Sequence, residues 1–207
     1  MLYLASRSPQ RAKLLADAGI AHVVVDSSAD EDAIQLPHPQ ALALERARRK
    51  AEEADLSGQT TWQDGDAVLA ADTVVSLGQV LLGKPHNDDE ARAMLRQLSG
   101  TSHVVTTAQC IHVPQRNGGN PVQAVGVSMA RVTMRELSDA DIDDYVASGE
   151  SRGRAGAYAI QETGDRFITD REGDFDTVVG LHVATVHRLY HEATGLTLDG
   201  RGAESLP

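Results

Sequence analysis

Apolar residues along this chain gather in short runs that are separated by amphipathic stretches. Runs at residues 2–5, 21–25 and 67–75 are rich in Val, Leu and Ala, which predicts β-strands, and the first of these strands is expected to be buried. Two longer runs, at residues 103–113 and 122–134, predict a pair of antiparallel strands. The chain therefore carries the strand signals of a substantial sheet.

The stretches between these runs repeat apolar residues at helical spacing, and they open on residues that are typical of helix starts. Ser8 and Pro9 predict an N-cap followed by proline at the first helical position, and Pro39 begins a longer helix. Ser138, with Asp141 three residues later, resembles a capping box with Asp in place of Glu. Strand–helix units combined with a long hairpin predict an α/β fold with a mixed sheet.

The length of 207 residues suits one large α/β domain or two small lobes around one cleft. Hydrophobic residues make up 41% of the chain, which is enough for a packed core. We expect a single domain over residues 1–194 and a frayed C-terminal tail over residues 195–207.

Acidic residues outnumber basic ones by 30 to 19, which gives a formal net charge of −11. Such a charge repels nucleic-acid backbones, and an aromatic content of 3% leaves few stacking platforms for single strands. No apolar run approaches the roughly 18 residues of a membrane helix. We therefore expect neither a nucleic-acid nor a membrane partner, and a phosphorylated ligand would need a local cluster of cations.

Cys110 is the only cysteine, so an intrachain disulfide is excluded. It lies in an apolar run, which favours a buried thiol over a nucleophile.

Residues 1–5 lack the basic segment that begins a signal peptide. The expected location is the cytoplasm.

Asp72 interrupts the apolar run at residues 67–75. An ionised carboxylate in such a run costs free energy unless it is paired or binds a metal. Its position indicates either a satisfied structural group or a catalytic one, and the catalytic interpretation is favoured.

The strand-to-helix junction at residues 6–11 predicts an anion site. A helix N-terminus presents free N–H groups and the positive end of the helix dipole. Ser6 adds a hydroxyl donor, and Arg11 on the first turn can donate two parallel hydrogen bonds. An ordinary N-cap with a surface arginine is the alternative.

Lys84 lies in a near match to the P-loop pattern, at residues 78–85 (GQVLLGKP). Pro85 replaces the hydroxyl that would meet Mg²⁺, and the Val-Leu-Leu segment predicts a strand, so we reject a P-loop. Lys84 could still reach a phosphate as a point charge or remain a solvated surface lysine.

Two further segments are candidates for ligand or metal binding: a helix face and an acidic loop. Arg46 and Lys50 are four residues apart and share one face, although the neighbouring glutamates favour a solvated face with ion pairs. Residues 30–32 (DED) could bind a hard cation through oxygen or form an exposed loop. No clustered Cys and His pattern is present, which argues against a structural zinc site.

Taken in order, these motifs resemble those of the Maf family, the septum-formation-inhibitor-like nucleoside triphosphate pyrophosphatases. Each motif alone is weak, but the ordered set is specific and runs through nearly the whole chain. The matching segments are residues 4–11, 30–31, 46–51, 71–75, 83–85, 98–108 and 153–161.

The resemblance implies an elongated, two-lobed α/β fold of Maf/ITPase type with a central nucleotide cleft. It implies hydrolysis of a nucleoside triphosphate to the monophosphate and pyrophosphate, with a divalent cation, Mg²⁺ or Mn²⁺, as cofactor. Asp72 would be the general base that activates water, and Glu31 would join it in placing the metal. The residues that would hold the triphosphate are Ser6, Arg11, Lys50 and Lys84.

Thr73 and Gln161 resemble the subgroup that acts on dTTP and UTP. An amide and a hydroxyl can pair with the carbonyl and imide edge of a pyrimidine. A hydrolase of modified purine nucleotides and a non-catalytic regulator of cell division remain as alternatives, and a homodimer is left open.

The sequence also departs from the family pattern near its C-terminal end. His182 stands where a proline would stiffen the segment at residues 177–182 (TVVGLH), and residues 170–176 are unusually acidic. Arg154 occupies a position where lysine is common. These departures bear on activity and substrate, and they leave the predicted fold unchanged.

Overall fold

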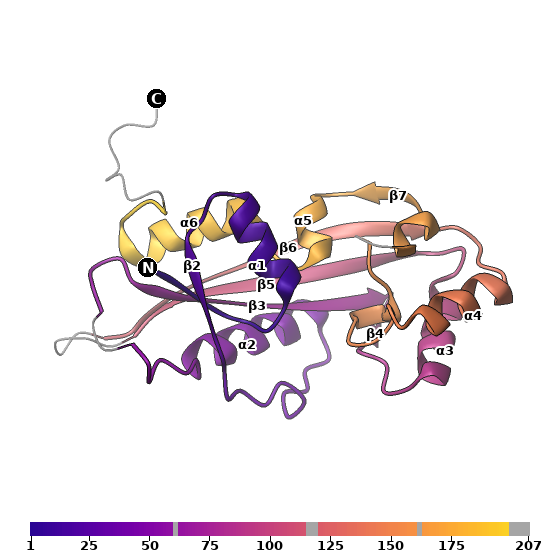
Figure 1. The fold of residues 1–207 in the computed structure, drawn as a ribbon, viewed down its shortest axis with the longest axis horizontal. Helices are drawn as coiled ribbons and strands as arrows, with labels where there is room; N and C mark the ends of the chain where they lie inside the picture. The colour runs from indigo at the N-terminus through magenta and orange to yellow at the C-terminus, as the bar shows by residue number, and fades with distance from the viewer. Residues whose placement is uncertain (60–61, 115–119, 161–162, 199–207) are drawn as a thin grey trace. The chain divides into compact units, whose positions relative to one another are not determined.

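The computed structural model describes residues 1–59, 62–114, 120–160 and 163–198 (Figure 1). In this part of the chain the strands form one sheet in the order β2-β1-β3-β5-β6-β7, with β4 paired to β3. The strands are β1 (Leu2–Ala5), β2 (His22–Val25), β3 (Ala67–Leu77), β4 (Val80–Leu82), β5 (Ser102–Val113), β6 (Val122–Met134) and β7 (Ile168–Glu172).

The sheet contains both parallel and antiparallel pairs. β1 pairs in parallel with β2 and β3, whereas β3 with β4 and β6 with β7 are antiparallel. The predicted mixed sheet of an α/β fold is therefore confirmed, and the two long strands β5 and β6 are neighbours as expected.

The helices are α1 (Pro9–Asp17), α2 (Pro39–Glu52), α3 (Asp88–Leu98), α4 (Asp139–Ser148), α5 (Phe175–Val179) and α6 (Val183–Thr194). The starts of α1, α2 and α4 agree with the sequence prediction. The capping box at α4 is confirmed, because the Ser138 side chain accepts from the Asp141 N–H and the Asp141 carboxylate accepts from the Ser138 N–H. Ser8 is the N-cap of α1, but its side chain makes no capping hydrogen bond and donates to Gln10 Oε1 instead.

Two elements had no clear sequence signal. β7 has the sequence ITDRE and is exposed along most of its length, so it lacks the apolar pattern of a buried strand. α5 has only five residues, which is too short to establish a helical repeat. Both fall in or beside the acidic stretch that the sequence marked as a departure.

Tertiary contacts divide the chain into two compact units. Unit 1 comprises Met1–Asp72, Thr107–Ser128 and Gly180–Pro207, and unit 2 comprises Thr73–Thr106 and Met129–Val179. The long strands β3, β5 and β6 contribute residues to both units. The single domain over residues 1–194 stays a prediction, and most of the tail predicted to fray, residues 199–207, lies outside the described residues.

The core of unit 1 forms against one face of β1 and β3. Leu4 and Leu69 pack there with Leu15 of α1 and Leu189 of α6. Because side chains alternate along a strand, the intervening residues of β3 face the other way. Figure 1 shows α1 and α6 on one side of these strands and α2 on the other. This alternation determines which β3 side chains meet α2.

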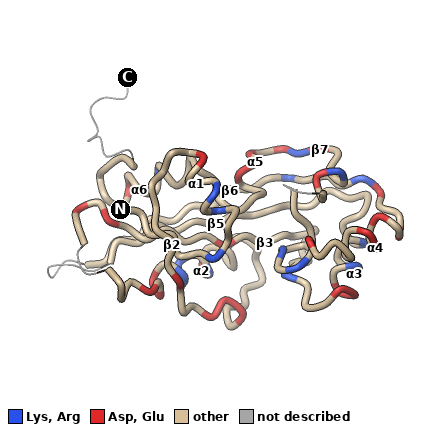
Figure 2. The backbone as a smooth tube through the Cα atoms, in the orientation of Figure 1, with Lys and Arg blue, Asp and Glu red and all other residues tan. Residues whose placement is uncertain are grey.

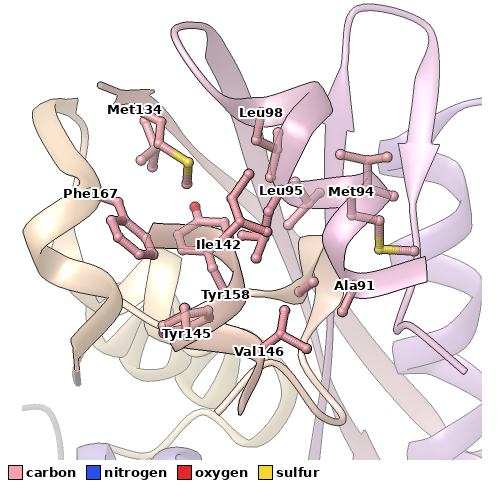
Figure 3. Packing of buried hydrophobic residues seen from close by; sticks show 14 of the residues in the cluster. Ala91, Met94, Leu95, Leu98, Met134, Ile142, Tyr145, Val146, Tyr158 and Phe167 are labelled. Carbon is pink, nitrogen blue, oxygen red and sulfur yellow. The ribbon is translucent and has the colours of Figure 1, made fainter. Parts of the chain in front are cut away.

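The core of unit 2 joins α3 and α4 to the sheet (Figure 3). Leu95 and Leu98 of α3 point toward Ile142 of α4, and all three side chains are almost fully buried. Tyr145 packs edge-on against Phe167, with ring centroids 5.2 Å apart. Each such buried side chain stabilises the fold by about 2 kcal/mol through removal of apolar surface from water.

The segment that contains Gly156 forms a tight turn. Gly156 has a φ of 71°, and a Cβ atom there would lie 3.1 Å from Cγ1 of Val75. Glycine is therefore required both for the left-handed backbone and for the close approach.

Among the described residues, every helix is too short or too polar to cross a membrane.

Candidate active site

Asp72 lies within β3 with its side chain almost completely buried. Ala71 packs in the unit 1 core, so the alternation of the strand directs Asp72 toward the face covered by α2. Within the described part of the chain, Asp72 Oδ2 is buried and has no hydrogen-bond partner. A buried carboxylate oxygen without a donor is costly for folding alone, which favours a functional role.

Lys50 of α2 is the cation that faces this carboxylate. Its Nζ atom lies 3.6 Å from Asp72 Oδ1 and 3.2 Å from Oε1 of Glu31. The side chain of Lys50 is 8% exposed, so the predicted solvated face is wrong at this position. The acidic loop and the apolar strand are thus joined through one buried ammonium group.

Arg11 and Ser6 lie together at the junction of β1 and α1, where the sequence predicted an anion site. Arg11 Nη1 donates to Ser6 Oγ at 3.2 Å, and Nε donates to the carbonyl oxygen of Gly180 at 2.8 Å. Arg11 is buried, which contradicts the alternative of a surface arginine beside an ordinary cap. The Ser8 N–H also donates to Ser6 Oγ, so this hydroxyl is held in a fixed position.

Burial shifts the pKa values of Asp72 and Lys50 at this site. It raises the pKa of the Asp72 carboxyl above its usual range, although Lys50 and Arg11 act in the opposite direction. Burial lowers the pKa of the Lys50 ammonium, and the positive charge of Arg11 lowers it further. Asp72 is therefore a stronger base, once ionised, than an exposed aspartate.

The other predicted residues are placed as follows. Thr73 follows Asp72 in β3, is half-buried, and by strand alternation points to the opposite face. Lys84 follows β4 in unit 2 and is exposed. Gln161 lies outside the described residues. The structure thus brings together Ser6, Arg11, Glu31, Lys50 and Asp72, all in unit 1. The functional roles of these five residues and of the other three stay predictions.

Comparison with known proteins bears on what this cluster does. The family model of Maf-like proteins matches residues 1–193. The chain belongs to the Maf family.

Individual Maf relatives are similar over most of their length. One from Anaeromyxobacter dehalogenans (strain 2CP-1) is 42% identical over 197 residues, which is 93% of each chain. One from Alcanivorax borkumensis is 41% identical over 181 residues, or 87% of this chain and 89% of the relative. One from Pseudoalteromonas atlantica is 36% identical over 189 residues, or 91% and 95%. All three relatives are named dTTP/UTP pyrophosphatase.

This Maf chain holds the segment around His182 without the proline of the family pattern. The amide of Gln109 on β5 accepts from the His182 N–H at 2.9 Å and donates to the His182 carbonyl at 3.1 Å. His182 Nδ1 also lies 2.8 Å from Thr185 Oγ1. Since Gly180 in the same segment accepts from Arg11, these hydrogen bonds stabilise the segment that orients the arginine.

The sequence named Arg46 with Lys50 on one candidate helix face but assigned Arg46 no binding role in this Maf protein. Its charge is close enough to lower the pKa of the Asp72 carboxyl. The only available signal was its spacing of four residues from Lys50, which local composition assigned to a solvated face. That interpretation is correct for Arg48 and Arg49, which pair with Glu45 on the same helix.

The carboxylates of the Maf site fit a divalent cation. Asp72 and Glu31 both lie against Lys50 Nζ, and Oδ2 of Asp72 is available for coordination. No group of three or more His, Cys, Asp or Glu side chains within the described ranges is arranged to hold a metal. Mg²⁺ commonly takes one or two carboxylates and completes its shell with water and substrate phosphates. The residues therefore suit a cation that arrives with a polyphosphate.

Proposed function

We propose that this chain hydrolyses dTTP and UTP to the nucleoside monophosphate and pyrophosphate. Its membership of the Maf family and the names of its relatives support this activity. The observation that carries the proposal is the buried, unpartnered Oδ2 of Asp72 beside the buried cations Lys50 and Arg11. A purely structural or interaction surface has no need for such an arrangement.

In the proposed reaction a water molecule attacks the α-phosphorus of the nucleotide. Asp72 accepts a proton from this water as the new P–O bond forms, and the bond from the α-phosphorus to the bridging oxygen of the β-phosphate breaks. The electron pair leaves on pyrophosphate. Arg11 and Lys50 stabilise the negative charge that develops on the phosphate oxygens.

The remaining roles follow the family resemblance. Ser6 and Lys84 bind the phosphate chain, and Thr73 and Gln161 recognise the base. A divalent cation bound at Glu31 and Asp72 supplies further neutralisation of phosphate charge. The proposed location is the cytoplasm. A measurement of the oligomeric state would decide whether the protein forms a homodimer.

The pH dependence of the reaction reflects the environment of Asp72. Because burial raises the pKa of this carboxyl, the protonated and inactive form persists to a higher pH than it would for an exposed aspartate. As the pH falls, kcat/KM is expected to decrease at a pH above the usual aspartate range. A pH profile of kcat/KM measures this property of the free enzyme. A decrease confined to the usual aspartate range would contradict the prediction.

Base selectivity is the main test of the proposed substrate. We expect dTTP and UTP to be cleaved well ahead of CTP, ATP and GTP. The amide of Gln161 can match the N3–H and carbonyl groups of thymine or uracil, whereas cytosine leaves a polar group unpaired, at a cost of about 1–3 kcal/mol. A pocket shaped for a single ring would also exclude purines. The measurement is kcat/KM for each nucleotide, with pyrophosphate release as the readout.

The variant Gln161→Leu is the matched test, because it should reduce the ratio of dTTP to CTP cleavage. Equal kcat/KM values for all nucleotides in the wild-type protein would contradict a base-reading site. Preference for a guanine nucleotide would favour the hydrolase of modified purine nucleotides. Absence of pyrophosphate release from every nucleotide would favour the non-catalytic regulator.

A further inference from the structure

Arg46 has an unusual environment for a charged side chain. It is half-buried on α2, and its Nε atom is fully buried without a hydrogen-bond partner among the described residues. Of the five N–H donors of its guanidinium, one at Nη2 reaches the carbonyl oxygen of Ile34, at 3.4 Å. In the described part of the chain this long hydrogen bond is its one polar contact.

The neighbouring arginines of α2 differ sharply from Arg46. Arg48 Nη2 lies 2.9 Å from Glu45 Oε1, and Arg49 Nη1 lies 3.2 Å from Glu53 Oε1. Arg46 forms no ion pair with any carboxylate of the described residues. The helix therefore carries two arginines whose charges are paired and one whose charge is not.

The position of Arg46 connects it to the candidate active site. It lies one helical turn before Lys50, so the two side chains leave the same face of α2. Lys50 contacts both Asp72 and Glu31, and Arg46 contacts the end of the loop that carries Glu31. The effect of its charge on the Asp72 carboxyl agrees with this proximity.

We propose that Arg46 is a binding residue for the phosphate chain of the nucleotide and for the pyrophosphate product. The proposal rests on the proposed function, because it assigns an additional cation to the same site. A guanidinium edge matches two phosphate oxygens in a bidentate arrangement. A bound phosphate would supply the negative charge that the described residues do not provide to this side chain.

The variant Arg46→Gln tests this role, because glutamine removes the charge and keeps an amide donor that can approach Ile34. We expect the KM for dTTP and the inhibition constant of pyrophosphate each to rise on the order of 10- to 100-fold, as for loss of a hydrogen bond to a charged group. Arg46→Lys keeps the charge and should raise both constants clearly less than Arg46→Gln does. Arg49→Gln makes the same charge change at a side chain that is 50% exposed and should leave both constants unchanged.

Two outcomes of these kinetic measurements would overturn the proposal. One is wild-type values of both constants in Arg46→Gln. The other is an equal loss of turnover in the Gln and Lys variants with an unchanged inhibition constant, which would assign Arg46 only a structural role at Ile34.

Calorimetric titration with pyrophosphate and Mg²⁺ separates this proposal from the proposed function. Weaker pyrophosphate binding in Arg46→Gln than in wild type supports the role of Arg46 even if no nucleotide is hydrolysed. Equal affinities of the two proteins would overturn it even if dTTP is cleaved.

Discussion

Replacement of Asp72 by asparagine is expected to lower kcat for dTTP about 10²- to 10⁴-fold, the usual contribution of a general base. Asparagine has nearly the same shape but cannot accept a proton from water at its amide. Since Asp72 is buried and its Oδ2 atom has no hydrogen-bond partner in the described residues, the loss should arise from chemistry and not from broken packing. The measurement is the steady-state rate of pyrophosphate release, together with a thermal unfolding curve.

The matched control is Asp66→Asn, which removes the charge of another buried carboxylate near the start of β3. Asp66 accepts hydrogen bonds from the N-terminal amino group and from the Gln63 N–H, away from Lys50. This variant should lose stability but keep its kcat when folded. A rate close to wild type in Asp72→Asn would contradict the assignment of the general base.

Removal of divalent cations is expected to abolish pyrophosphate release. A triphosphate carries several negative charges, and in a protein with a formal net charge of −11 the cations Arg11 and Lys50 only partly offset them. Activity should disappear in excess chelator and return when Mg²⁺ or Mn²⁺ is added beyond the chelator concentration. Figure 2 shows Lys and Arg interspersed with Asp and Glu along the described part of the backbone.

The melting temperature of the nucleotide-free protein should change little with chelator. Glu31 and Asp72 each form an ion pair with Lys50, and these ion pairs need no cation, so we expect the fold to be independent of the metal. Full catalytic activity in excess chelator would exclude a metal requirement. A large loss of melting temperature in chelator would instead indicate a structural metal, contrary to the proposed binding with substrate.

Local sequence was sufficient to predict most of the elements. The N-terminal bounds of α1, α2 and α4 follow from residues within one turn of each helix, such as Ser138 and Asp141 at α4. Asp72 could be identified because a carboxylate inside an apolar strand is a local conflict that needs an explanation. β7 and α5 were missed because an exposed edge strand and a five-residue helix leave too weak a periodic pattern.

The sequence by itself determined the α/β class and the mixed sheet, and it identified Asp72 as a candidate catalytic residue. Only the tertiary structure decided that Lys50 and Arg46 do not take part in the ion pairs along the exposed side of α2. It also decided that Arg11 is buried and donates to the carbonyl oxygen of Gly180. The physical reason is that helical spacing shows which residues share a face but not what that face meets. Lys50 and Asp72 are 22 positions apart in the chain, and the packing of α2 on the sheet, which depends on many long-range contacts, brings them together.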